Sequence, residues 1–229
     1  MQKKTSRLQS WFGVQDMTVG RPMDSLVRFS IPLLVGNLAQ QLYNTVDSIV
    51  VGQYIGDTAL AAVGTAGPIL NLLLVLFMGI ATGASILSAQ YFGAHDRQHL
   101  SRVVGASILL TVSSSILMGF VGFFASPWLM SLVNPPADVL DGAVIYLQII
   151  FIGILGTATY NILAGVLRGL GDSLMPLVSL LVASLLNIVL DIVFVRDLRM
   201  GVAGVAWATI IAQAISGTMC LVRLCRMRQ

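Results

Sequence analysis

The chain of 229 residues is 56% hydrophobic and only 10% charged, and its ten acidic residues are all aspartates. Soluble domains carry about 25% charged residues, so this composition excludes an ordinary soluble domain and indicates a polytopic membrane protein. The formal net charge is +3. The basic residues cluster at the ends of apolar runs, where membrane topology explains them, so no nucleic acid is expected as a partner.

The N-terminal segment, residues 1–26, is expected to be a cytoplasmic tail. Charged residues such as Lys3, Asp16 and Arg21 interrupt it, so it lacks the apolar core of a cleavable signal peptide. Trp11 and Phe12 leave open an interfacial helix in place of a disordered tail. Residues 27–225 are expected to form one all-α membrane domain.

Six apolar segments long enough to cross a bilayer follow in chain order. A spanning helix needs about 20 predominantly apolar residues, and the segments are 28–50, 59–87, 103–125, 139–163, 173–195 and 201–223. If both termini are cytoplasmic, eleven of the 13 Lys and Arg residues fall on the cytoplasmic side, and only Arg196 and Arg199 fall outside. The positive-inside rule therefore predicts cytoplasmic termini.

Glycines recur at the four-residue spacing that lets helices approach closely in lipid. The pairs are Gly52 and Gly56, Gly79 and Gly83, and Gly165 and Gly169. The simplest interpretation is helix packing. The run RGLGD at 168–172 follows no strand, so it is interpreted as a tight cytoplasmic turn and not as a phosphate-binding loop.

One face of the first apolar segment is polar. Its members follow the i, i+3/i+4, i+7 spacing of a single helical face, and they are Asn37, Gln40, Gln41, Asn44, Asp47 and Ser48. Polar groups facing lipid would be strongly penalised. This face is therefore expected to contact protein or water.

Shorter polar faces recur in the last three segments. They are Thr157 with Tyr160 and Asn161, then Ser184 with Asn187 and Asp191, and finally Thr209 with Gln213 and Ser216. Neutral polar groups in membrane helices often serve only as interhelical hydrogen bonds, worth about 0.6 kcal/mol on average. That remains the simpler interpretation of Thr157, Ser184, Gln213 and Ser216.

Asp47 and Asp191 need a stronger explanation than packing. A charge at the bilayer centre costs at least roughly 2.5–3.5 kcal/mol, and no Lys or Arg lies at matching depth in the sequence. Counting about 1.5 Å per residue puts both acids in the outer part of the membrane, with Thr209 within reach and Asn161 nearer the cytoplasm. Carboxylate, amide and hydroxyl oxygens suit Na⁺, and a desolvated carboxylate beside a like charge suits proton carriage. The residues leave both ions open.

Four stretches resemble the MATE (multidrug and toxic compound extrusion) transporters, most of all the DinF-like branch. They are 31–64, SAQYFGAHD at 88–96, 161–195 and GVAGVAWATIIAQ at 201–213. The resemblance implies a cation-coupled antiporter that exports cationic or amphiphilic small molecules across a bacterial inner membrane by alternating access. It implies no cofactor other than the coupling ion, H⁺ or Na⁺.

The resemblance also implies a cation site. Asp47 matches the Asp of YNxxD, and Asn187 and Asp191 match the Asn and Asp of NIxxD. Asn161 matches the Asn that precedes LRGxGD, and Thr209 matches the Thr of WAT. Asp47 and Asp191 would be the ligands of a coupling Na⁺. The residues expected to line the cavity are Asn37, Gln40, Tyr43, Asn44 and Gln213.

The chain departs from the family in carrying one six-helix lobe where the family has two. Three explanations are open: a truncated product, a split transporter whose second lobe is another chain, or a homodimer of half-transporters. Two other functions are also open. One is a flippase for a lipid-linked oligosaccharide, which would require basic residues in the cavity, whereas the buried ionisable groups are expected to be acidic. The other is a non-transporting remnant. No catalytic motif lies at membrane depth, so an enzyme is not expected.

Overall fold

The computed structural model describes residues 22–227, without the side chains at 22–29, 32, 33, 39, 42–44 and 47. The described part is helical, with short connections between its elements. The elements are α2 (Pro22–Tyr54), α3 (Asp57–Gly93), α4 (Arg97–Val133), α5 (Ala137–Ile152), α6 (Ile154–Gly169), α7 (Leu174–Asp191), the π-helical η1 (Ile192–Asp197) and α8 (Gly201–Met227).

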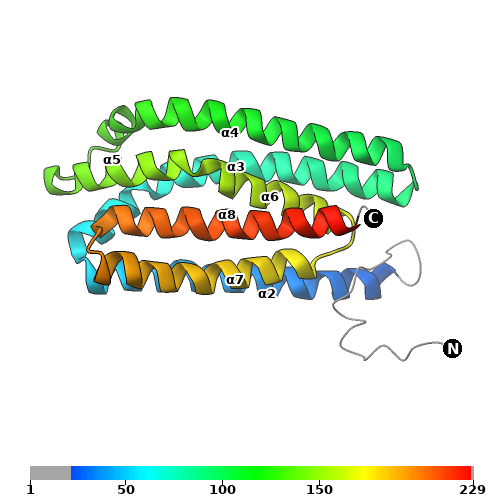
Figure 1. The fold of residues 1–229 in the computed structure, drawn as a ribbon, viewed down its shortest axis with the longest axis horizontal. Helices are drawn as coiled ribbons and strands as arrows, with labels where there is room; N and C mark the ends of the chain where they lie inside the picture. Colours follow the sequence, from blue (N-terminus) through cyan, green and yellow to red (C-terminus); the bar gives the residue numbers. More distant parts are fainter. Residues whose placement is uncertain (1–21, 228–229) are drawn as a thin grey trace.

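The helices lie side by side along one long axis (Figure 1). Helix α6 packs against α3 and α8, and α7 packs between α8 and α2. Helix α2 begins at Pro22, five residues before the expected start of the membrane domain at residue 27. Proline is well suited to the first position of a helix because its missing N–H needs no partner there. The expected tail up to residue 21 lies outside the described residues.

The core of the bundle is made of apolar side chains from neighbouring helices. One cluster joins Phe77 of α3, Met130 of α4 and Leu147 of α5, and a second joins Val51 of α2 and Val205 of α8. Many large apolar side chains on the outer surfaces of α3 and α4 remain exposed. Such a surface suits a hydrocarbon environment, where the outside of a bundle is as apolar as its core.

Four helical stretches in the described part of the chain are long and apolar enough to cross a membrane: α3, α4, α7 with η1, and α8. The bent pair α5–α6 brings the number to five if it forms one span. Helix α2, which carries the polar face, is not among them. The structure therefore supports a multi-pass membrane protein, and the sixth span and the cytoplasmic termini remain predictions.

The expected span 139–163 is not one straight helix. Helices α5 and α6 meet at Gly153 with a bend of 52°. A side chain at Gly153 would collide with Ile210 of α8. The absence of a Cβ atom therefore lets α8 pack directly against the bend, and α6 is redirected toward α3.

The glycine pairs differ in what they contact. A Cβ atom on Gly165 would lie 2.6 Å from the backbone oxygen of Ala81, and one on Gly169 would collide with the backbone oxygen of Ser85. Close packing therefore explains this pair, at the crossing of α6 and α3. A Cβ atom on Gly79 or on Gly83 would lie in open space, so interpreting this pair as packing residues was wrong for the described part of the chain. The run after α6 forms the expected turn, with Gly171 at φ 83°.

Candidate functional site

Asp191 ends the α-helical part of α7 and is completely buried, as is Asn187 one turn before it. The Asn187 amide nitrogen donates to Asp191 Oδ2 at 3.0 Å, and its oxygen accepts from the backbone N–H of Thr209 at 3.2 Å, in the amide orientation that satisfies both partners. The structure thus brings together three of the five expected cation-site residues. The connection runs from α7 to α8.

Helix α8 carries a row of buried oxygens that begins at Thr209, the residue that contacts this network. Thr209 Oγ1, Gln213 Oε1 and Ser216 Oγ have no hydrogen-bond partner among the described residues. Their spacing of four and three residues places them on one helical face. Buried polar atoms in folded proteins are nearly always satisfied by protein, water or a ligand. These oxygens are therefore candidates for contact with an ion, water or a substrate.

A cavity of about 510 Å³ lies beside the network. Helices α2, α3, α5, α6, α7 and α8 all contribute to its walls. The expected residues on its wall are Asn37, Gln40, Asn161, Thr209 and Gln213. Thr209 belongs both to this wall and to the Asn187 hydrogen bond. The residue therefore links the buried carboxylate to the cavity.

Three expected residues of α2, Tyr43, Asn44 and Asp47, have side chains that lie outside the described residues. The backbone of α2 packs along α7. This arrangement is compatible with a second carboxylate near Asp191. The pairing of Asp47 with Asp191 remains a prediction.

Asn161 lies on the cavity wall, where its amide nitrogen donates to the Thr157 backbone oxygen at 2.8 Å. Counting along the helices had put it nearer the cytoplasmic side than Asp191. This hydrogen bond stays within α6, and Asn161 faces the cavity with Thr157 and Tyr160. Its role as a direct cation ligand remains a prediction.

Arg168 is the functional candidate that the sequence interpretation missed. Its side chain lines the cavity, so the expectation that the buried ionisable groups are all acidic was wrong. Arg168 had been assigned to a loop because it lies near the end of an apolar run. The missed signal was its spacing, since it follows Thr157 by eleven residues and Asn161 by seven, on the same helical face.

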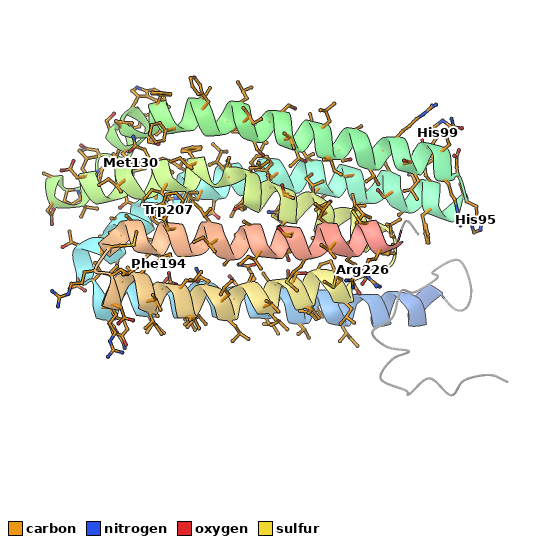
Figure 2. The ribbon with its side chains drawn as sticks, in the orientation of Figure 1. His95, His99, Met130, Phe194, Trp207 and Arg226 are labelled. Carbon is orange, nitrogen blue, oxygen red and sulfur yellow. The ribbon has the colours of Figure 1, made fainter. Side chains whose placement is uncertain are left out.

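Two other groups of charged residues have structural partners. Asp172 is buried, and its carboxylate accepts from Arg223 Nε at 2.8 Å and from the backbone N–H of Met175 at 3.1 Å. In the α3–α4 turn, Asp96 accepts from the backbone N–H of His99 at 3.0 Å. That bond, together with the His99 ring, lowers the pKa of the Asp96 carboxyl below its usual value. These contacts explain both acids as helix-end stabilisers (Figure 2 labels His95 and His99).

The sequence matches the family described as MatE over residues 32–193, which is more than half of the chain. Among curated proteins, "Probable multidrug resistance protein YpnP" of Bacillus subtilis is 36% identical over 201 residues, covering 88% of this chain and 45% of the relative. "DNA damage-inducible protein F" of Escherichia coli is 29% identical, covering 82% of this chain and 41% of the relative. The chain therefore spans about half the length of the curated relatives it matches.

Solved structures show the same relation. An outward-facing "multidrug resistance MATE family transporter of the MOP superfamily" aligns with a TM-score of 0.85 and 28% identity, covering 100% of this chain and 49% of that protein. A MOP superfamily transporter from Pyrococcus furiosus, reported to have a "reverse polarity of binding pocket", aligns with a TM-score of 0.84 and 29% identity. The alignment covers 97% of this chain and 48% of that protein. The described fold corresponds to one lobe of these proteins.

Proposed function

Because this chain belongs to the MatE family of membrane transporters, which are not enzymes, we propose that it forms the N-terminal lobe of a cation-coupled multidrug antiporter. In this proposal it exports cationic and amphiphilic small molecules by alternating access in a bacterial inner membrane. The coupling ion is H⁺ or Na⁺. The curated names of relatives, which include multidrug resistance proteins of Bacillus subtilis and Thermotoga maritima, support the assignment.

The observation that carries the proposal is the buried Asp191–Asn187–Thr209 network beside the cavity. A fully buried carboxylate is costly unless it is neutralised or well hydrogen-bonded. A coupling ion would neutralise it. The Asp191 carboxylate, the Asn187 amide oxygen and the unsatisfied Thr209 Oγ1 are oxygen donors of the kind that Na⁺ binds, and the carboxylate alone would suffice for H⁺.

Coupling follows from the electrostatics of this network. With the ion bound, Asp191 is neutral and can remain buried, which favours the arrangement in which α7 and α8 are packed together. With the ion released, the buried negative charge raises the free energy of that arrangement. Thr209 links the ion-bound and ion-free states of Asp191 to the shape of the cavity. Its backbone N–H contacts Asn187, and the residue also lines the cavity. A change of ion occupancy would thereby change the affinity for substrate.

The direct test replaces Asp191 with Asn, which keeps the shape of the side chain and removes its charge. Vesicles containing the transport-competent assembly should lose dye efflux driven by an H⁺ or Na⁺ gradient, while the variant still reaches the membrane. Asp197→Asn is the matched control, because Asp197 is an exposed acid at the end of η1. Undiminished efflux by Asp191→Asn would contradict the proposal.

A binding measurement avoids the need for a second lobe. Trp207 lies on α8 two residues before Thr209. In a background with Trp11 and Trp128 replaced by Phe, its fluorescence should respond to Na⁺ or to pH. The response should disappear in Asp191→Asn and persist in Asp197→Asn.

The alternative of a lipid-linked oligosaccharide flippase is favoured by one observation, the presence of Arg168 in the cavity. A pyrophosphate carries at least two negative charges, and a single Arg neutralises only one of them. Drug export therefore remains the proposal. Competition between a cationic dye and a lipid pyrophosphate for the purified protein distinguishes the two, since a flippase would prefer the lipid.

We also propose that the complete transporter contains a second lobe, from another chain or from a second copy of this one. The solved relatives are about twice as long as the region that this chain matches. Reconstitution of this chain alone, and together with a candidate second lobe, tests the point. Ion-driven efflux by neither preparation would favour a non-transporting remnant.

A further inference from the structure

We propose that Arg168 binds an oxyanion, the carboxylate or phosphate group of an amphiphilic substrate, at one end of the 510 Å³ cavity. The inference rests on the proposed function in one respect, namely that this cavity receives the substrate. Arg168 would add a basic group to a site in which the proposed function uses only an acidic one, Asp191.

Arg168 is half-buried and, among the described residues, lacks the acidic partner that such a guanidinium would ordinarily have. It lies in the last turn of α6 on the cavity wall, and it forms no ion pair with any side chain that the structure describes. The acid nearest to it in sequence, Asp172, is already held by Arg223 at 2.8 Å. The five N–H donors of Arg168 are therefore available to a group that enters the cavity.

The position of Arg168 is fixed by the packing of the helix that carries it. Its neighbour Gly169 lies so close to α3 that any side chain there would collide with the Ser85 backbone oxygen, and Gly165 contacts Ala81 in the same way. Ser85 and Ser173 line the cavity with Arg168. The guanidinium is thus carried by a rigid helix crossing, which favours specific binding over an adaptable surface contact.

The cavity also defines the shape of the ligand. Along α6, Arg168 lies seven residues beyond Asn161, which corresponds to about 10 Å of helix axis. The walls of the same cavity include the apolar side chains of Phe77, Met78 and Leu177. The matching molecule has an anionic group at one end, an apolar or aromatic body, and a polar or cationic group about 10 Å away.

Rhodamine 110 and rhodamine 123 provide a matched pair of probes, because they differ in a free carboxylate and its methyl ester. We expect the purified chain in detergent to bind rhodamine 110 more tightly than rhodamine 123 by about tenfold or more, the range of a charge-assisted hydrogen bond. Arg168→Gln should abolish this preference by lowering the affinity for rhodamine 110, and it should not lower the affinity for the cationic rhodamine 123. Arg226→Gln, which removes an exposed Arg outside the cavity, should change neither affinity.

A second arm distinguishes the two sources of oxyanion. Dihexanoyl phosphatidic acid is used to displace rhodamine 123, with neutral dihexanoylglycerol as its control. Displacement by the phosphatidic acid that requires Arg168 identifies a phosphate ligand, and an Arg168-dependent preference for rhodamine 110 without such displacement identifies a carboxylate ligand.

The inference is overturned if neither effect depends on Arg168. It is equally overturned if the unaltered protein binds the two dyes with equal affinity and phosphatidic acid displaces rhodamine 123 no better than dihexanoylglycerol does, a result that does not require any variant to fold. These are equilibrium measurements without an ion gradient and without a change at Asp191. If the unaltered assembly shows no ion-driven efflux but the chain still prefers rhodamine 110 in an Arg168-dependent way, the result counts against the proposed coupling and leaves the oxyanion site standing.

Discussion

Asp191 is stabilised by a residue of its own helix. Asn187 lies four positions earlier, on the same face, and its amide connects the carboxylate to the backbone of Thr209. Both side chains are inaccessible to solvent. A hydrogen bond to a charged group contributes about 1.5–3 kcal/mol, more than a neutral one. Asn187 is therefore a structural support of the carboxylate as well as a candidate ligand.

Asn187→Leu should destabilise the folded lobe. The substitution keeps the number and branching of the side-chain heavy atoms but removes the donor to Asp191 Oδ2, so the free energy of unfolding should fall by about 1–3 kcal/mol. Chemical unfolding in detergent micelles measures the change. Ser184→Ala is the control on the same helix, because the Ser184 hydroxyl donates to the Leu180 backbone oxygen of its own helix. Equal effects of both substitutions would contradict the role given to Asn187.

The sequence predicted which polar residues lie together where they follow helical spacing along one face of a helix. The spacing placed Asn187 with Asp191, and Thr209 with Gln213, and the structure brings the first pair against Thr209. The cavity position of Arg168 was not predicted, because a basic residue near the end of an apolar run is normally assigned to the cytoplasmic interface. Recognising it required knowledge of where α3 and α7 lie around α6.

At the scale of the helices, the crossing of α3 and α6 positions the cavity. Gly165 and Gly169 face the α3 backbone, and the absence of side chains there permits a close approach. Dispersion contacts replace the hydrophobic effect as the main attraction between helices in lipid, so such approaches matter for stability. Gly79 and Gly83 have the same spacing on α3, but a Cβ atom on either of them would lie in open space.

Gly169→Ala and Gly83→Ala therefore form a matched pair. The first places a methyl group against the Ser85 backbone oxygen, which cannot move aside as a side chain could, and should destabilise the lobe by about 1–3 kcal/mol. The second meets open space and should have little effect or raise helix stability slightly, since Ala has the higher helix propensity. Thermal unfolding in detergent compares the two. A larger loss for Gly83→Ala would refute the packing derived for the crossing.

The bend between α5 and α6 shows why helix geometry could not be fully predicted from the sequence. The apolar run 139–163 contains no proline, so local propensity favours one continuous helix. The bend occurs at Gly153, where Ile210 from α8 fills the space that a side chain would need. Its cause is a contact between residues 57 positions apart. No periodicity within the run could reveal it.

For the whole molecule, the two ends of the bundle differ in charge. Figure 2 shows His95, His99 and Arg226 at one end and Phe194 at the other. Arg97, Arg102 and Arg223 belong to helix ends on the first side, whereas Arg196 and Arg199 lie on the second beside Asp197. Because Lys and Arg are enriched in cytoplasmic loops, the first end is predicted to be cytoplasmic. If Arg168 binds substrate as proposed, this orientation determines the side of the membrane on which it does so.

Cysteine labelling can test the orientation with residues that the chain already contains. Cys225 is exposed near the end of α8, and Cys220 is buried with its thiol near Ser179. A membrane-impermeant maleimide should label Cys225 in inverted vesicles and not in intact spheroplasts, and Cys225→Ser should remove the labelling. Leu198→Cys, placed at an exposed position at the opposite end in the Cys225→Ser background, should show the reverse pattern. Labelling of Cys225 from the outside would show that the bundle has the opposite orientation in the membrane. In the proposed transporter, Arg168 would then bind substrate on the exit side and not on the entry side.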